Sequence, residues 1–147
     1  MTKVVGIDLG VRSIHVSTQE CAVSITVDKS ERSGELRKLF TKYMEMFDTY
    51  DTVAFIEEPL VAGPRNIRTA LQMAQLAGAL MTVMPSYLVP VATWKKEVVG
   101  KGNATKDEVA EYLRPLPVFA HTDGSQDLID ATCIRLYGER QIDKVRV

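Results

Sequence analysis

Residues 4–10 read VVGIDLG, and this stretch decides the fold because it joins a short apolar run to an acid and a turn. A continuous apolar run of this length predicts a buried strand, and Leu-Gly predicts the turn that ends it. The strand would carry the carboxylate of Asp8 to the edge of a sheet. An Asp before Leu-Gly is also explained as a simple turn former, so the remaining sequence has to distinguish the two interpretations.

The segments that follow alternate between two periodicities, one typical of strands and one of helices. Near-alternation with β-branched residues predicts two antiparallel strands that follow the first as a meander. Apolar positions three and four residues apart predict helices, one of which opens with a Thr-x-x-Glu capping box. We expect strands at 4–8, 14–17, 22–27, 52–56 and 88–91, and helices at 33–47, at 66–84, from Thr105 onward and from Ser125 or Asp123 to Leu136.

This order of elements predicts an α/β fold with a mixed five-stranded sheet. A three-stranded antiparallel meander would be extended by two parallel strands, with helices on both faces. The arrangement is similar to the ribonuclease H-like fold. A length of 147 residues fits a single domain that spans residues 1–147.

The composition limits the classes of function. No run of ~18 or more apolar residues is present, so we expect no membrane span, and the N-terminal apolar run is too short for a signal peptide. Cys21 and Cys133 lie in apolar contexts without metal-ligand spacing, which is typical of core thiols in a reducing cytoplasm. The net charge of −1 does not favour nucleic acid by itself, but basic residues gather in residues 95–106 and at Arg65 and Arg68.

Four acids are predicted to meet at one edge of the sheet. Asp8 and Glu57 each end a short buried strand, and parallel neighbouring strands present such ends at the same edge. Asp127 and Asp130 lie three residues apart near the start of a helix, so they share one face. Clustered carboxylates repel one another, and an all-oxygen set suits Mg²⁺, or Mn²⁺ in its place. Two such ions per site are able to stabilise the attacking and leaving oxygens of a phosphodiester.

Four motifs stand in order over most of the chain: GIDLG at 6–10, IEE at 56–58, VVGKG at 98–102 with a lysine at 106, and DLIDA at 127–131. Together they resemble the RuvC family of Holliday junction resolvases. The third is the most diagnostic, because other ribonuclease H-like nucleases and actin-like ATPases share the acids but not that segment. At the second, the family's Ile-Glu-Gln pattern assigns the ligand role to Glu57 rather than Glu58, and at the first Leu9 stands where proline is usual.

The resemblance implies an endodeoxyribonuclease that acts as a homodimer on branched DNA, chiefly four-way junctions. Each of two active sites would nick one strand and leave a 5'-phosphate end, with Lys106 stabilising the charge that develops in the transition state. The small residues of the helix at 66–84 suit a dimer face or ordinary packing on the sheet. Where the family often has an aromatic residue, Leu60 is able to wedge between bases but not to stack on them. The residues expected at the DNA are Lys95, Lys96, Lys101, Lys106, Arg65, Arg68 and Leu60, with the backbone of Gly100 and Gly102.

Other interpretations stay open. A nuclease with the same fold and metals would act on forks, flaps, three-way junctions or single strands. A non-catalytic junction-binding protein or a nucleotide-binding relative is a further alternative, since an Asp-x-Gly start also occurs in actin-like ATPases. The chain is too short for the second lobe of those ATPases. His15 and Trp94 are predicted to be structural, and His121 to lie on the surface.

Overall fold

The computed structural model describes residues 2–28, 33–45, 51–59 and 67–145, and its centre is a five-stranded sheet in the order β3-β2-β1-β4-β5. β1, β2 and β3 pair antiparallel, whereas β4 is parallel to β1 and β5 is parallel to β4. The predicted meander and the two parallel strands are therefore confirmed. The strands are β1 (Lys3–Leu9), β2 (Ser13–Ser17), β3 (Ala22–Thr26), β4 (Thr52–Glu57) and β5 (Ser86–Val89).

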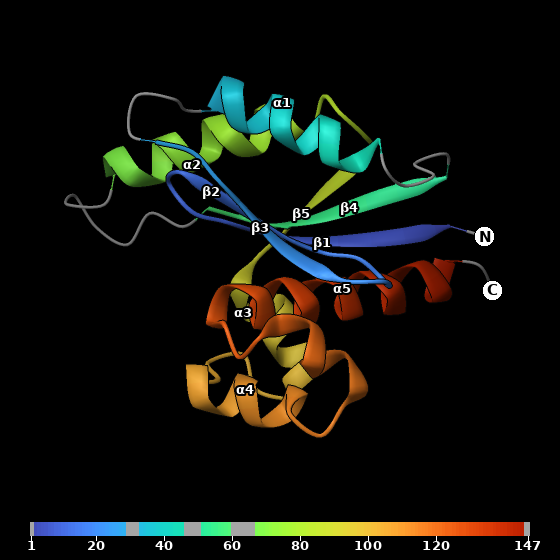
Figure 1. Ribbon diagram of the computed structural model, residues 1–147. Helices are drawn as coiled ribbons and strands as arrows, with labels where there is room; N and C mark the ends of the chain where they lie inside the picture. The colour runs from blue at the N-terminus through green and yellow to red at the C-terminus, as the bar shows by residue number, and fades with distance from the viewer. Residues whose placement is uncertain (1, 29–32, 46–50, 60–66, 146–147) are drawn as a thin grey trace.

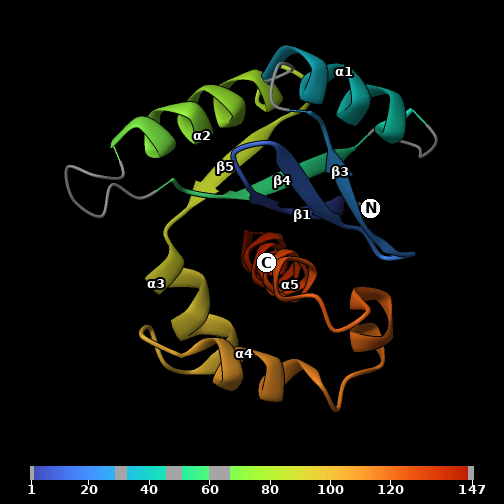
Figure 2. The same ribbon diagram turned by 60° about the vertical axis from the view of Figure 1, so that its left-hand side comes forward.

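Helices cover both faces of the sheet, as predicted (Figure 1). α1 (Ser33–Met44) and α2 (Ile67–Leu80) pack on one face, and α5 (Gln126–Val145) crosses the other. A further layer lies beyond α5, and each side of the sheet has its own apolar cluster (Figure 2). That layer consists of α3 (Val91–Trp94), the π-helix η2 (Lys95–Val99), α4 (Lys106–Leu113) and the 3-10 helix η3 (Pro117–Thr122).

The backbone of α5 touches the backbone of β1. A Cβ atom on Gly6 would lie 2.2 Å from the carbonyl oxygen of Ala131 and 2.4 Å from the amide nitrogen of Arg135, so only glycine permits this approach. Ala131 lies one helical turn after Asp127, and Asp8 lies two residues after Gly6 on the same face of β1. The close crossing therefore sets the first turn of α5 against the carboxyl end of β1.

The predicted strand at 88–91 is wrong in its position. β5 ends at Val89, and α3 begins at Val91. The reason is Pro90, which has no N–H to continue the sheet ladder and whose φ of −62° suits the residue before a helix. α5 also continues to Val145, past the predicted end at Leu136.

Other local predictions are confirmed. The hydroxyl of Thr105 accepts from the Glu108 amide at 3.2 Å, and the Glu108 carboxylate accepts from the Thr105 amide at 3.2 Å, which is the expected capping box. Cys21 and Cys133 are both free thiols, and Cys133 is buried. Within the described ranges, no helix combines the length and the apolar character that crossing a bilayer requires.

Candidate active site

Four carboxylates from three elements meet at the carboxyl ends of β1 and β4. The parallel register pairs Ile7 with Ile56, so the next residues, Asp8 and Glu57, lie side by side. Their side chains share a hydrogen bond, and the charges of Asp127 and Asp130 also act on Asp8. We call Asp8, Glu57, Asp127 and Asp130 the carboxylate cluster.

Asp8 is the buried centre of the cluster, with only 6% of its surface exposed. Its pKa is raised from 3.8 to about 10. Burial is the largest cause, and the charge and hydrogen bond of Glu57 and the charges of Asp130 and Asp127 act in the same direction. The folded protein therefore keeps a proton on Asp8 at neutral pH, and that proton occupies the hydrogen bond with Glu57.

Asp130 begins the second turn of α5 and is half-buried. Burial is the largest influence and raises its pKa to about 6, and the charge of Glu57 acts in the same direction. A hydrogen bond that Gln126 Nε2 donates to Asp130 Oδ1 at 2.9 Å opposes this shift, as does the positive charge of Lys95. Gln126 is one turn earlier on the same helix, so it fixes the rotamer of the carboxylate locally.

Asp127 is the most accessible member, with 60% of its side chain exposed, and it lies 3.5 Å from His15 Nε2. His15 is directly opposite Asp8 in the β1–β2 pairing. Its Nδ1 is 2.8 Å from Ser24 Oγ and its Nε2 is 3.0 Å from Ser13 Oγ. Burial lowers the pKa of His15, against the smaller opposing effect of Asp127, which favours the neutral form of the ring.

The contact between His15 and Asp127 was not expected from the sequence. His15 lies in a strand as predicted, but it also borders the cluster. Extending the hairpin register outward from the β1–β2 turn would have revealed that it faces Asp8. Trp94 was likewise expected only to pack. It is fully buried, and its indole N–H also donates to Glu57 Oε1 at 3.0 Å.

The donor chemistry of the cluster fits a hard divalent cation. All four side chains offer oxygen, and one of them is held neutral in the folded protein by a proton that a cation would replace. Among the described residues, no three His, Cys, Asp or Glu side chains already converge on one point as a ligand set does. Asp8 and Glu57 share a proton instead, and Asp127 lies against His15. Binding therefore requires loss of that proton and rotation of side chains.

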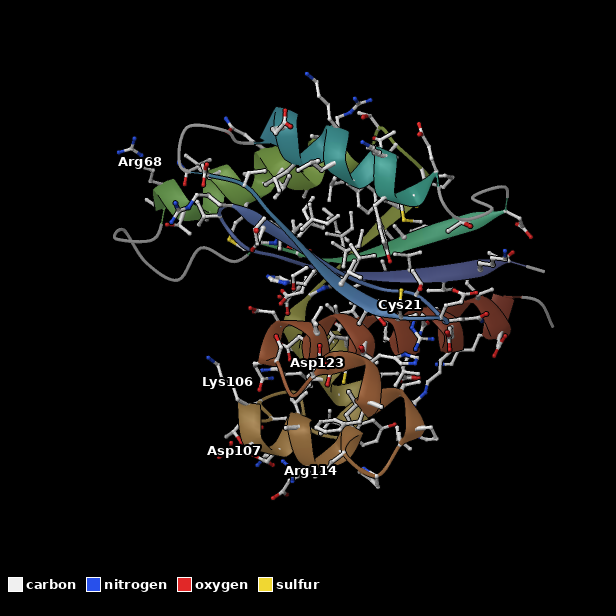
Figure 3. All side chains as sticks on the ribbon, viewed as in Figure 1. Cys21, Arg68, Lys106, Asp107, Arg114 and Asp123 are labelled. Carbon is white, nitrogen blue, oxygen red and sulfur yellow. The ribbon has the colours of Figure 1, made fainter. Side chains whose placement is uncertain are left out.

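The predicted basic residues divide into two groups. Lys95 donates to the carbonyl oxygen of Ala104 at 3.0 Å, and Lys101 pairs with Glu108 at 3.2 Å, so both hold the loop before α4. Lys96 and Lys106 are exposed. Figure 3 shows Lys106 at the start of α4, extending into solvent on the side of the molecule where α5 begins.

The remaining predicted residues lie outside the carboxylate cluster. Gly100 ends η2 with a φ of +99°, a backbone conformation that favours glycine. A Cβ on Gly102 would lie 3.3 Å from the Ala92 carbonyl oxygen. Arg68 is exposed near the start of α2 (Figure 3). Glu58 is exposed and His121 lies in η3, and neither contacts the cluster in the described part of the chain. Leu60 and Arg65 lie outside the described residues.

Comparison with known proteins identifies the family of the chain. The family model described as crossover junction endodeoxyribonuclease RuvC matches residues 4–137, a range that contains the whole carboxylate cluster. The chain belongs to the RuvC family. RuvC proteins of Citrifermentans bemidjiense and of Geobacter sp. (strain M21) are each 31% identical to it over 133 residues, covering 84% of this chain and 78% of the relative.

Two solved RuvC structures share the fold. Thermus thermophilus RuvC in complex with a Holliday junction substrate superposes with a TM-score of 0.71 at 19% identity, covering 92% of both chains. The structure of T. thermophilus RuvC superposes with a TM-score of 0.67 at 19% identity, covering 90% of both chains. These likenesses confirm the predicted mixed five-stranded sheet, and the family match confirms the RuvC resemblance.

Proposed function

We propose that this RuvC-family protein is a cytoplasmic endodeoxyribonuclease that resolves four-way DNA junctions by metal-dependent paired nicking. The observation that carries the proposal is the carboxylate cluster at the strand ends, in a chain whose relatives are named crossover junction endodeoxyribonuclease. One solved neighbour is described in complex with a Holliday junction substrate. Branched DNA is therefore the substrate class we assign.

RuvC-family nucleases are metal-dependent, and the cluster supplies the ligands for that dependence here. Two Mg²⁺ ions per site, with Mn²⁺ able to substitute, suit four oxygen donors. When bound, such ions stabilise charge on the attacking and leaving oxygens of the phosphodiester. The chain's own part is to release the Asp8 proton and to hold the other carboxylates in place through Trp94, Gln126 and His15.

The exposed cations are proposed to hold the DNA. The side chain of Lys106 has no hydrogen bond or ion pair with any described residue, and it projects from the first turn of α4. It is free to approach a phosphate and to stabilise charge that develops during cleavage. Phosphate contacts are also proposed for Lys95, Lys96, Lys101, Arg65 and Arg68, with Gly100 and Gly102 allowing close backbone approach and Leu60 meeting the bases.

A homodimer is proposed through α2. One stripe of this helix is apolar and exposed, with Leu71 exposed by 60% and Ile67 by 46%. Ala74 and Gly78 continue it at spacings that keep them on one face, and the exposed Met81 directly follows the helix. The small residues allow a second helix to approach closely. A second copy of the chain on this stripe would provide the two active sites that paired nicking needs.

Cleavage of a mobile four-way junction in Mg²⁺ tests the proposal. Asp130→Asn should lower the cleavage rate by at least about 100-fold while junction binding in Ca²⁺ is kept, because only a ligand charge is removed. Asp143→Asn, an exposed acid farther along α5, is the matched control and should cleave at the wild-type rate.

The substrate assignment has its own readout. Symmetric paired nicks with 5'-phosphate ends are expected on the four-way junction, with slower cleavage of forks, flaps and single strands at the same salt concentration. Wild-type cleavage by Asp130→Asn would remove the metal-site assignment. A clear preference for single-stranded tails would show that four-way junctions are not the substrate, while the assignment as a nuclease would remain.

A further inference from the structure

Trp94 connects the second helical layer to the carboxylate cluster. It is the last residue of α3, no part of it is exposed, and its Nε1 donates to Glu57 Oε1 at 3.0 Å. It belongs to the apolar cluster that also contains Val89, Val98 and Ile134. A large side chain packed on all sides has one orientation, so the direction of its N–H is fixed by the core rather than by Glu57.

This contact leaves Glu57 able to accept a cation. The indole is a neutral donor with a single hydrogen, so it occupies one acceptor position of Oε1 and leaves the other acceptor positions of the carboxylate for Asp8 and for a cation. A lysine or arginine in its place would neutralise the carboxylate and compete with a metal ion. A neutral donor orients the ligand and keeps its charge, which is the usual task of groups that surround metal ligands.

The plainer explanation is that a buried Trp needs a partner for its N–H and finds one here. The side chains beside the other carboxylates favour a positioning role in addition. Gln126 donates to Asp130 at 2.9 Å, and the Nε2 of His15 lies 3.5 Å from the carboxylate of Asp127. Each of the three outer carboxylates thus lies against a nitrogen of a side chain other than lysine or arginine, and these side chains come from three separate elements. A buried tryptophan that merely finds a partner for its N–H would not explain why all three carboxylates have such a neighbour.

We propose that Trp94 is a positioning residue that fixes the Glu57 carboxylate for a divalent cation held together with Asp8. The inference rests on the metal role of Glu57 proposed above. Trp94 is also the only tryptophan among the 147 residues, so its emission reports on this one contact. A cation at Glu57 changes the charge next to the indole N–H, and the emission should change with it.

The first experiment follows tryptophan emission of the whole protein during titration with Mg²⁺ alone. We expect a saturable change in the wild type and none in Asp8→Asn, which keeps Trp94 but removes the neighbouring ligand charge. Ca²⁺ gives a second titration without any cleavage chemistry. An emission unchanged by Mg²⁺ concentrations that support cleavage would overturn the positioning role.

The second experiment measures Mn²⁺ affinity by electron paramagnetic resonance of the free ion. Trp94→Phe keeps an aromatic ring but loses the N–H, and we expect affinity to fall by about 10- to 100-fold. Leu113→Val is the matched control, since it removes volume from the same buried cluster without touching a carboxylate, and it should bind Mn²⁺ as the wild type does.

The outcomes distinguish failure of the positioning role of Trp94 from failure of the proposed metal site. Wild-type Mn²⁺ affinity in a folded Trp94→Phe protein overturns the positioning role and leaves the nuclease proposal intact. An equal loss of affinity in Leu113→Val would show that general loosening is responsible, and this also overturns it. No Mn²⁺ binding by the wild type would remove the metal site itself. If Trp94→Phe does not fold, the emission titration of the wild type and Asp8→Asn decides.

Discussion

Replacing the buried acid at the centre of the cluster should stabilise the metal-free protein while destroying its activity. Asp8 is 6% exposed, and its pKa is raised to about 10 by burial and by Glu57, Asp130 and Asp127. The folded state therefore holds a proton at neutral pH that the unfolded chain releases. Asp8→Asn removes this requirement, keeps the shape of the side chain and allows its amide to donate to Glu57.

The size of the effect follows from the ordinary pKa. Keeping a proton at pH 7.5 on a carboxyl whose usual pKa is 3.8 costs about 5 kcal/mol, at 1.36 kcal/mol per unit. Local rearrangement and solvent lower that limit, so we expect Asp8→Asn to gain about 2–3 kcal/mol. For a chain of this length the gain corresponds to an increase in Tm of about 4–12 °C.

The pH dependence has a defined sign. Between pH 3.8 and about 10 the folded wild type binds more protons than the unfolded chain, so its free energy of unfolding falls as pH rises. Asp130, with a pKa raised to about 6, adds to this slope only below about pH 6. Asp8→Asn should therefore show a much flatter stability curve between pH 6 and pH 9.

The assay is thermal and urea unfolding in EDTA across that pH range, repeated in Mg²⁺. Mg²⁺ should raise the Tm of the wild type and have little effect on Asp8→Asn, because binding to the folded state alone is stabilising. Asp143→Asn, on the exposed part of α5, should match the wild type throughout. A lower Tm for Asp8→Asn than for the wild type at pH 7.5 in EDTA would refute the reasoning.

Two further predictions concern the surface. Leu71→Glu places a charge in the middle of the apolar stripe of α2 and should weaken the proposed dimer by at least about 30-fold, measured by sedimentation equilibrium; an unchanged dimer would exclude α2 as its interface. Lys106→Ala should lower the single-turnover cleavage rate by about 100-fold without changing Mn²⁺ affinity, and an unchanged rate would place this lysine outside the reaction.

Much of the site could be predicted because it depends on local pattern and simple topology. Asp8 and Glu57 follow apolar runs, and a right-handed crossover makes their strands parallel neighbours. Helical spacing places Asp127 and Asp130 on one face of α5. These arguments need only the period of each element and the order of the strands.

The contacts around the cluster could not be predicted in the same way. Trp94 reaches Glu57 because the chain enters the helix α3 directly after Pro90. The apolar residues at this point fit a strand equally well, so their pattern does not predict the helix. A π-helix then follows and brings Lys95 back to the Ala104 carbonyl. A helix of four residues continued by a π-helix has no periodicity long enough to detect, so tertiary packing decides its path.

The distribution of charge explains why stability and function are coupled at this site. In the described part of the chain, no lysine or arginine forms an ion pair with any member of the carboxylate cluster. Lys95 comes near enough to lower the pKa of Asp130, yet its ammonium group is bound to the Ala104 carbonyl. Basic residues that would stabilise the fold by pairing with these acids would also neutralise the ligands. The repulsion is therefore left for a cation to relieve, and until one binds, the proton on Asp8 removes one charge from the repelling set at a cost in stability.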